Sequence, residues 1–269
     1  MLLWSKEIAN KIIEELKPVV ARQQRCLAIV QVGDNEISAS YIRKKQERAQ
    51  ELGVAVKIEK LADALPEDAV KEAISAIAAK KEIDGMIVQL PLPRYLTTQA
   101  VLDCIPPEKD VDVLSSAAFG RFVLEVESAL LPPVVLAVAR LLQEAEVDLQ
   151  GADVTVVGAG RLVGLPLAIW LLQKKATLHI ATAHTKNLAE LTKKSDIIIS
   201  GAGKPGLIKG NMINRGAVVI DVGAALDTGQ IKGDVDIESV AKVARALAPV
   251  PGGVGPLTVA YLLRNLFLL

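Results

Sequence analysis

Short, continuously apolar runs alternate along this chain with longer segments in which apolar residues recur every three or four positions. The apolar run from Cys26 to Val32 lies between helical patterns that extend from Ser5 to about Ala21 and from Ser38 to Leu52. A strand that is apolar throughout is buried on both faces, and strands that alternate with helices pair in parallel. This alternation restricts the chain to an α/β fold built on parallel sheets.

The first half of the chain continues the pattern. Strands are predicted from Val54 to Leu61 and from Gly85 to Gln89, and a helix that opens with a proline is predicted from Pro66 to Lys80. With the first strand, these segments form a βαβαβ unit. A proline-rich stretch follows, which is expected to form turns and short helical pieces. The segment from Ser115 to Pro133 is expected to connect two domains ahead of a helix from Val134 to Leu142.

A second series of strands and helices begins at Ala152 with a strand that runs into a glycine-rich turn. This start is typical of a Rossmann-like half. After another turn, from Pro249 to Pro256, a last apolar helix is predicted from Leu257 to Phe267. The strands of this half are expected at residues 152–157, 176–182, 196–200 and 217–222, with one helix ending at Leu172 and another over residues 187–194.

Charge and cysteine content exclude several classes of function. The 269 residues carry 31 basic and 31 acidic side chains, so the net charge of zero gives no general attraction for nucleic acid or for an anionic membrane. Cys26 and Cys104 are too few for a disulfide framework, and Lys6 and Glu7 interrupt the apolar start that a signal peptide needs. We therefore expect a cytoplasmic protein without a nucleic-acid or membrane partner.

The glycine-rich turn is the first candidate site. Gly158, Gly160 and Gly164 would let backbone N–H groups and a helix dipole hold a phosphate, although their spacing departs from the dinucleotide fingerprint and a purely structural turn explains them too. The next strand ends without the Asp or Glu that binds the ribose of NAD, which favours NADP or a damaged site. His179 and His184 share no Cys or Asp cluster, so no metal site is expected.

Polar residues in the first half are candidates for chemistry. Tyr41 and Lys45 lie four residues apart on one face of a predicted helix, where a phenol can hydrogen-bond a lysine and tune its proton affinity. A simple solvated basic helix is the alternative. Gln89 ends an apolar strand at the carboxyl edge where open α/β sheets bind ligands, or else its amide closes a loop.

Two loops supply further candidates. Asp110 and Asp112 follow two prolines, and a carboxylate can accept the paired N–H donors of an amino-pyrimidine edge. An Asp in such a turn also commonly caps its own backbone. The loop that contains Pro251, Gly252 and Gly253 lets backbone approach a flat ligand closely, or is an ordinary turn.

Eight motifs follow one another in a distinctive order: YIRKK, VQLPLP, PEKDVD, GRLVGLP, KNLAELTKKSDIIISGAGKP, GAVVIDVG, GDVD and PVPGGVGPLTVAYLLRN. Through these motifs nearly the whole chain resembles the bifunctional methylenetetrahydrofolate dehydrogenase/methenyltetrahydrofolate cyclohydrolase family. The resemblance implies an N-terminal α/β folate-side domain of residues 1–126 plus 247–269, and a C-terminal Rossmann-like, parallel-sheet NAD(P)-binding domain of residues 127–246. It also implies a cleft between the two domains and a homodimer.

The resemblance assigns roles to individual residues. Lys45 matches the catalytic lysine, Tyr41 the tyrosine that stacks near the folate ring and modulates that lysine, and Gln89 the glutamine that hydrogen-bonds it. Asp112 matches the carboxylate that binds the pterin. The implied catalytic residues are thus Lys45, Tyr41, Gln89 and Asp112, and the implied substrate-binding residues are Tyr41, Gln89, Asp112, Pro251, Gly252 and Gly253.

The nucleotide side departs from the family pattern. Arg161 lies two positions along from the usual arginine, and Ala181–Thr185 replaces the usual Cys-His-Ser-x-Thr. The implied cofactor is NADP, with NAD as an alternative, held by Gly158, Gly160, Arg161, Gly164 and His184. The implied reactions are oxidation of 5,10-methylenetetrahydrofolate with NADP and hydrolysis of the methenyl product to 10-formyltetrahydrofolate. A folate-binding paralogue that is cyclohydrolase-only or has lost redox activity is the alternative.

Overall fold

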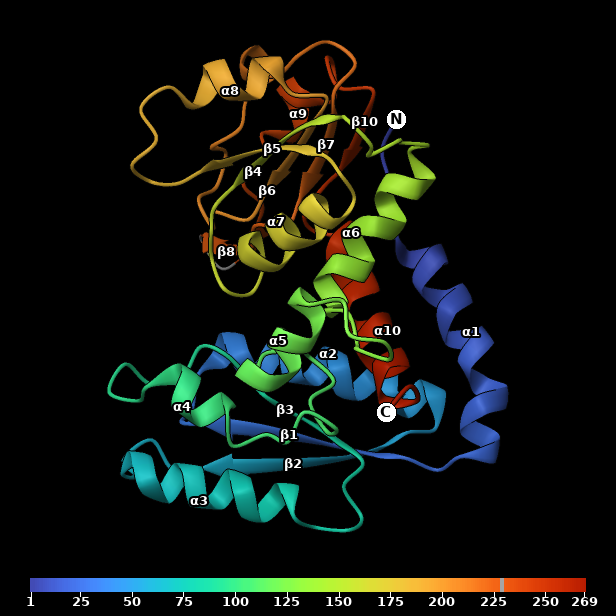
Figure 1. Ribbon diagram of the computed structural model, residues 1–269, viewed down its shortest axis with the longest axis vertical. Coiled ribbons are helices and arrows are strands. Elements are labelled where there is room, and N and C mark those ends of the chain that lie inside the picture. Colours follow the sequence, from blue (N-terminus) through green and yellow to red (C-terminus); the bar gives the residue numbers. More distant parts are fainter. Residues whose placement is uncertain (228–229) are drawn as a thin grey trace. The chain divides into compact units, whose positions relative to one another are not determined.

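The computed structural model describes residues 1–227 and 230–269 (Figure 1). Contacts divide the chain into two compact units. The three-stranded unit comprises Asn10–Pro133 and Val259–Leu269, and the five-stranded unit comprises Met1–Ala9 and Val134–Thr258. These divisions differ from the expected boundaries after residues 126 and 246. The first nine residues also join the five-stranded unit, where the expectation put them in the other one.

The three-stranded sheet has the parallel βαβαβ connectivity predicted from the sequence. Strands β1 (Cys26–Val32), β2 (Ala55–Leu61) and β3 (Gly85–Val88) are ordered β2-β1-β3, and both pairs are parallel. The connecting helices are α2 (Glu36–Leu52) and α3 (Glu67–Ala78). Because β1 lies between the other two strands, six of its seven residues are buried, which explains its nearly continuous apolar sequence.

Local capping fixes where α2 begins and ends. The Asn35 side chain accepts a hydrogen bond of 3.0 Å from the Ser38 backbone N–H, which satisfies one free donor of the first turn. At the other end Gly53 adopts φ +82°, a left-handed conformation that glycine reaches without steric cost. These caps set the register of the helix that carries Tyr41 and Lys45.

Two short helices follow β3, the first in the stretch where turns and short helical pieces are expected and the second in the expected connection between domains. They are α4 (Thr98–Leu102) and α5 (Ser116–Val123). The hydroxyl of Ser115 caps α5 by accepting a hydrogen bond of 3.3 Å from the Ala118 N–H. The expected connection from residue 115 to residue 133 is therefore partly helical.

Three helices contain the points at which the chain passes from one unit to the other. They are α1 (Lys6–Arg22), α6 (Pro133–Glu144) and α10 (Val254–Leu266). Asn265, in the last turn of α10, donates its amide to two backbone carbonyls of the three-stranded unit, each at 3.0 Å. The end of α10 is thereby attached to that unit, although its start belongs to the five-stranded one.

The five-stranded sheet is parallel throughout and has the order β10-β7-β6-β4-β5. Helices α7 (Gly164–Gln173) and α8 (Leu188–Lys194) follow β4 and β5, and they lie on opposite faces of the sheet (Figure 1). The connection from β4 to β5 runs toward one edge of the sheet, and the connection from β5 to β6 runs back toward the other. Because both crossovers are right-handed, their helices lie on opposite faces. The strands are β4 (Asp153–Val157), β5 (Thr177–Ala181), β6 (Ile197–Ser200), β7 (Val218–Asp221) and β10 (Ala246–Ala248).

Several short elements of this unit were not predicted. Besides β10, they are the 3-10 turn η1 (Gly210–Met212), the antiparallel pair β8 (Ala225–Asp227) and β9 (Gln230–Lys232), and helix α9 (Ile237–Val240). Each spans three or four residues, too few for a hydrophobic period to be recognised. Within residues 1–227 and 230–269, no helix combines the length and the apolar character needed to cross a bilayer.

Candidate active site

Lys45 and Gln89 meet at the carboxyl end of β3. Lys45 comes from α2, and Gln89 directly follows the last residue of β3. The Lys45 Nζ donates a hydrogen bond of 2.9 Å to Gln89 Oε1, and Gln89 Nε2 donates one of 2.7 Å to the Leu90 carbonyl. The second bond fixes the orientation of the amide, so its oxygen faces the lysine.

Burial and charge act on this lysine in opposite directions. Burial lowers the pKa of Lys45, and the carboxylate of Asp112 partly opposes that effect. Burial likewise raises the pKa of Asp112, which Lys45 lowers and Asp110 raises further. The two groups therefore form an electrostatically coupled pair, and the lysine amine gives up its proton more readily than an exposed one.

The structure distinguishes the two aspartates that the sequence left open. Asp110 accepts hydrogen bonds from the backbone N–H groups of Asp112 at 3.2 Å, Leu114 at 2.9 Å and Ser115 at 2.7 Å. Asp110 is therefore the residue that caps the turn. The Asp112 carboxylate forms no hydrogen bond in the described part of the chain, so it is available to a ligand.

Tyr41 lies on the same helix as Lys45 but is not its partner. No hydrogen bond joins the two side chains, both of which are described, and the Lys45 amine donates instead to Gln89. The suggested phenol–lysine hydrogen bond is therefore wrong. Tyr41 is half-buried with a pKa raised by burial, and the Lys44 Nζ lies 5.8 Å from the centre of its ring.

Ser38 is a residue of this site that the sequence analysis missed. It precedes Tyr41 by three positions and Lys45 by seven, so the three side chains share one face of α2. Ser38 is only 2% exposed, and its hydroxyl has no partner among the described residues. An unpaired buried hydroxyl costs free energy, which a bound ligand would recover. The spacing of Ser38 from Tyr41 and Lys45 along the predicted helix was the signal in the sequence that could have identified it.

In the other unit, the glycine-rich turn after β4 is sterically demanding. Gly158 has φ +95°, and a Cβ on it would lie 2.7 Å from the Gly201 carbonyl oxygen. A Cβ on Gly164 would lie 1.8 Å from the Gly158 oxygen, whereas one on Gly160 would meet nothing within 4 Å. Two of the three expected glycines are thus required by close backbone approach.

This turn lies at the point where the strand order reverses. Strand β4 is flanked by β5 and β6. The chain leaves β4 toward β5 on one side and leaves β6 toward β7 on the other, so the two connections diverge on opposite faces of the sheet. Open α/β sheets bind ligands at such a point. The residue before α7 is Val163, whose side chain makes no cap. The Leu165 N–H donates to the Gly160 carbonyl at 3.0 Å and the Leu167 N–H to the Val163 carbonyl at 3.2 Å, and Pro166 has no N–H, so it is the positive end of the helix dipole that favours a phosphate here. These residues fit the pyrophosphate of a dinucleotide.

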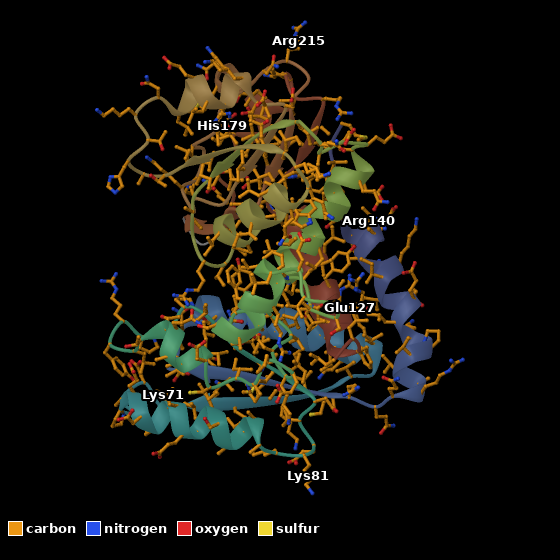
Figure 2. All side chains as sticks on the ribbon, in the orientation of Figure 1. Lys71, Lys81, Glu127, Arg140, His179 and Arg215 are labelled. Carbon is orange, nitrogen blue, oxygen red and sulfur yellow. The ribbon has the colours of Figure 1, made fainter. Side chains whose placement is uncertain are left out.

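The turn after β5 carries no acidic side chain to bind a ribose. Its backbone is closed by hydrogen bonds from the Thr182 N–H to Thr185 Oγ1, at 2.9 Å, and from the His184 N–H to Thr182 Oγ1, at 3.2 Å. His184 and Arg161 are both exposed. His179, labelled in Figure 2, lies in β5 with Nε2 4.0 Å from Asp153 Oδ1.

Two buried aspartates that the sequence analysis did not single out hold neighbouring loops, Asp234 the loop after β6 and Asp221 the segments at Gly223 and at residues 234–235. Asp234 accepts hydrogen bonds from Ser200 Oγ and from the N–H groups of Ala202 and Lys204, at 2.6 to 2.7 Å. Asp221, at the end of β7, accepts three backbone N–H groups, yet burial raises its pKa to about 7. The motifs GAVVIDVG and GDVD, which contain these two aspartates, were the signal in the sequence that could have identified them.

The turn of Pro251, Gly252 and Gly253 follows β10. The Gly253 N–H donates to the Pro249 carbonyl at 2.8 Å, and Gly252 has φ +103°. A Cβ on Gly253 would lie 2.6 Å from the same Pro249 oxygen. The turn is therefore compact and depends on both glycines, as close approach to a flat ligand requires.

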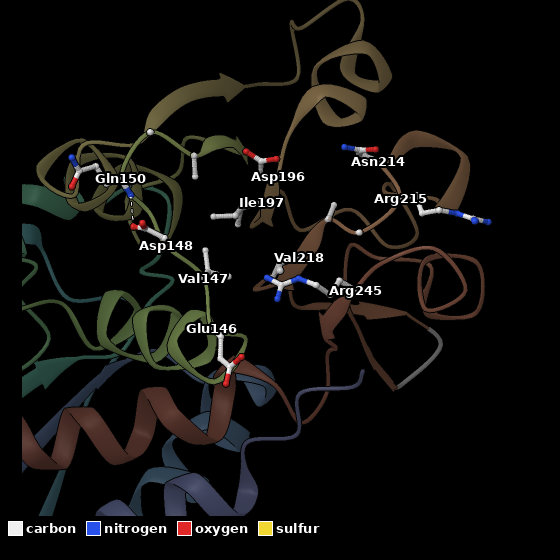
Figure 3. A pocket seen from close by; sticks show the side chains of 14 residues that line it. Glu146, Val147, Asp148, Gln150, Asp196, Ile197, Asn214, Arg215, Val218 and Arg245 are labelled. Carbon is white, nitrogen blue, oxygen red and sulfur yellow. Dashed lines mark hydrogen bonds between the residues drawn. The ribbon is translucent and has the colours of Figure 1, made fainter.

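A separate cavity of about 430 Å³ lies at the opposite edge of the five-stranded sheet (Figure 3). Its lining residues precede β4, β6, β7 and β10, so it lies at the amino ends of the strands. It includes Asp148, Asp196, Arg215 and Arg245 but none of the expected nucleotide-binding residues. This cavity is distinct from the candidate dinucleotide site.

Comparison with known proteins matches both units. The family model for the tetrahydrofolate dehydrogenase/cyclohydrolase catalytic domain matches residues 3–112, and the model for the NAD(P)-binding domain of the same family matches residues 132–269. The chain is 40% identical over 267 residues to a bifunctional protein FolD of Hydrogenobaculum sp. (strain Y04AAS1), covering 98% of this chain and 96% of that protein.

Solved structures agree. The bifunctional enzyme FolD, a methylenetetrahydrofolate dehydrogenase/cyclohydrolase from Campylobacter jejuni, is similar with a TM-score of 0.94 and 37% identity, covering 99% of this chain and 97% of that one. The Trypanosoma brucei N5,N10-methylenetetrahydrofolate dehydrogenase-cyclohydrolase, complexed with NADP cofactor and an inhibitor, is similar with a TM-score of 0.95 and 32% identity, covering 100% and 96%.

Proposed function

Because this chain belongs to the tetrahydrofolate dehydrogenase/cyclohydrolase family, we infer that it catalyses two consecutive reactions of a folate. It oxidises 5,10-methylenetetrahydrofolate to 5,10-methenyltetrahydrofolate with NADP, and it hydrolyses that product to 10-formyltetrahydrofolate. The observation in this chain that carries the conclusion is the Lys45 amine, held 2.9 Å from Gln89 with a pKa that burial lowers.

Lys45 is suited to moving protons in the hydrolysis. Water loses one proton as it adds to the methenyl carbon, and the hydroxyl so formed loses a second as the formyl C=O bond forms. The ring nitrogen gains one proton as its bond to that carbon breaks, and the other proton is released to solvent. An amine with a lowered pKa can accept a proton from the water and deliver one to the nitrogen. Gln89 holds the amine in place, since its own amide is fixed by the Leu90 carbonyl.

The folate is bound by the groups around this lysine. The Asp112 carboxylate, free of other hydrogen bonds in the described chain, accepts the paired N–H donors of the pterin. The half-buried ring of Tyr41 stacks near the folate ring, and the buried Ser38 hydroxyl supplies a further hydrogen bond. The turn of Pro251, Gly252 and Gly253 lets backbone approach a flat ring closely, and the family resemblance assigns it to substrate binding.

In the dehydrogenase reaction the protein mainly orients the reactants. NADP, when bound, supplies the acceptor for the hydride. Gly158, Gly160 and Gly164 let backbone approach the pyrophosphate at the start of α7, where the helix dipole favours negative charge. The exposed side chains of Arg161 and His184 bind the 2′-phosphate end of the cofactor.

The replacement of Lys45 tests this proposal. Lys45→Met is expected to abolish hydrolysis of methenyltetrahydrofolate while folate binding persists, because the pterin is held by Asp112. The rate of hydrolysis and the folate affinity are measured in parallel, with Lys44→Met as the matched control on the same helix. Hydrolysis at the wild-type rate in Lys45→Met would show that Lys45 has no catalytic role.

Assays of oxidation with NADP and with NAD test the second reaction. No observation in the described residues favours the alternative of a cyclohydrolase-only or purely folate-binding paralogue. The family resemblance also supports a homodimer in the cytoplasm, without a nucleic-acid partner. Sedimentation of the purified protein at several concentrations tests the dimer, and fractionation of cells tests the location.

A further inference from the structure

The first five residues run beside β10 and the turn that follows it. The Leu3 N–H donates to the Leu247 carbonyl at 2.8 Å, and the Leu247 N–H donates to the Met1 carbonyl at 2.9 Å. Further along, the Ser5 N–H donates to the Gly252 carbonyl at 3.0 Å. This segment therefore extends its pairing beyond β10 and onto the turn of residues 249–253.

Ser5 binds the turn through its side chain as well. Its hydroxyl is oriented to donate to the carbonyls of Gly252, at 3.1 Å, and of Gly253. Ser5 is fully buried, and its own carbonyl accepts the Ala9 N–H at 2.8 Å at the start of α1. Loss of this hydroxyl would leave Gly252 bonded to Ser5 only through the backbone N–H and would remove the buried bond from Ser5 to the Gly253 carbonyl, so the position of the turn would be less well fixed.

Trp4 covers the same turn from one side. A Cβ on Gly252 would lie 2.7 Å from Cε3 and from Cζ3 of the Trp4 ring, so the ring lies directly against the glycine. Trp4 is nevertheless 55% exposed, whereas a large aromatic ring that only packs in a core is buried. Its described contact at Gly252 instead blocks the turn from moving toward the N-terminal segment.

We propose that Ser5 and Trp4 are positioning residues for the dehydrogenase reaction, because together they fix the backbone of Gly252 and Gly253. The proposal rests on the inferred function of this turn in binding substrate and nicotinamide. Hydride transfer depends on the alignment of two flat rings, and an error of about 1 Å can cost on the order of a hundredfold in rate. Hydrolysis depends instead on Lys45, which lies in the other unit.

The test compares both activities in Ser5→Ala and Trp4→Ala, with Trp4→Phe as the conservative variant and Lys6→Ala as the control. Lys6 is an exposed neighbour in the same segment. We expect kcat for oxidation to fall roughly tenfold in Ser5→Ala and Trp4→Ala, and hydrolysis to change less than about threefold. Trp4→Phe and Lys6→Ala are expected to stay near the wild type. Since Trp4 is half-exposed, its variants retain the fold even if Ser5→Ala does not.

Hydrogen–deuterium exchange of the segment 249–253 supplies a readout independent of activity. Exchange is expected to be faster in Ser5→Ala and Trp4→Ala and unchanged in Lys6→Ala. An equal loss of both activities in Trp4→Ala, or unchanged oxidation, would overturn the proposal, as would unchanged exchange. A wild-type protein without either activity would instead contradict the proposed function, and exchange would still decide whether the two residues hold the turn.

Discussion

Replacing Gln89 by glutamate places a negative charge against the lysine on which hydrolysis is proposed to depend. Glu is nearly isosteric with Gln, but its carboxylate cannot donate to the Leu90 carbonyl as the Gln89 amide does, so the attraction of Lys45 must hold it in place. We take the present Nζ to oxygen distance of 2.9 Å for the calculation. At that separation and an effective dielectric constant of about 20, the Coulomb attraction is roughly 6 kcal/mol before the cost of desolvation. Nearby opposite charges in proteins change a pKa by roughly one to three, which is the effect we expect on Lys45.

The direction of this change can be read from the pH dependence of hydrolysis. If neutral Lys45 accepts the proton of water, the rate rises with pH through the pKa of Lys45. Gln89→Glu raises that pKa, so the rising limb moves to higher pH and the rate below it falls by about tenfold for each pH unit of displacement. The rate is measured after subtraction of uncatalysed hydrolysis, together with folate affinity.

Gln89→Met is the matched control, because it removes the acceptor without adding a charge. A hydrogen bond to the charged amine favours the charged form, so its loss is expected to lower the pKa of Lys45 and to move the limb to lower pH. Opposite displacements in the two variants support the proton-accepting role. A limb that stays in place in Gln89→Glu, with folate still bound, would refute it.

Three further predictions concern the carboxylates and the cofactor. Asp112→Ala is expected to weaken folate binding by roughly 2 to 4 kcal/mol in a calorimetric titration, because it leaves buried pterin donors unpaired; an unchanged affinity would mean that Asp112 does not bind the pterin. The pKa of Asp221 is raised to about 7 from its ordinary value of 3.8, so between roughly pH 4 and 7 the native state binds a proton that the unfolded state has lost. The free energy of unfolding therefore declines as pH rises through that range, by up to about 4 kcal/mol. This decline in urea unfolding should be absent in Asp221→Asn, and its persistence would assign it to another group. Arg161→Ala is expected to weaken NADP by roughly tenfold to a hundredfold and NAD much less, since one charge-assisted contact to phosphate is worth about 1.5 to 3 kcal/mol. Tight NADP binding that ignores Arg161 would show that another group holds the 2′-phosphate.

The sequence alone predicts the α/β class and most of the longer elements. The strand from Cys26 to Val32 begins and ends where predicted, and the helix predicted from Val134 to Leu142 lies within α6. Such segments can be recognised because burial on both faces of a sheet requires a continuous apolar run, and one buried helix face requires a repeat of three to four. The ordered motifs likewise identify the family from the sequence alone, because each motif is a short continuous segment of the chain.

Contacts between distant segments were decided only by the tertiary structure. Local spacing does not say which of Asp110 and Asp112 caps the turn, and the four-residue spacing of Tyr41 and Lys45 suggested a bond that the structure does not contain. The Lys45–Gln89 bond spans 44 positions and was implied only by the family resemblance, and the bond between Ser5 and Gly252 spans 247 positions and was not predicted. A local pattern reports which face of an element is buried, but the pairing of side chains depends on how the elements pack. Three-residue strands such as β10 depend on the same packing, because a single short strand is stabilised by its neighbours rather than by its own sequence.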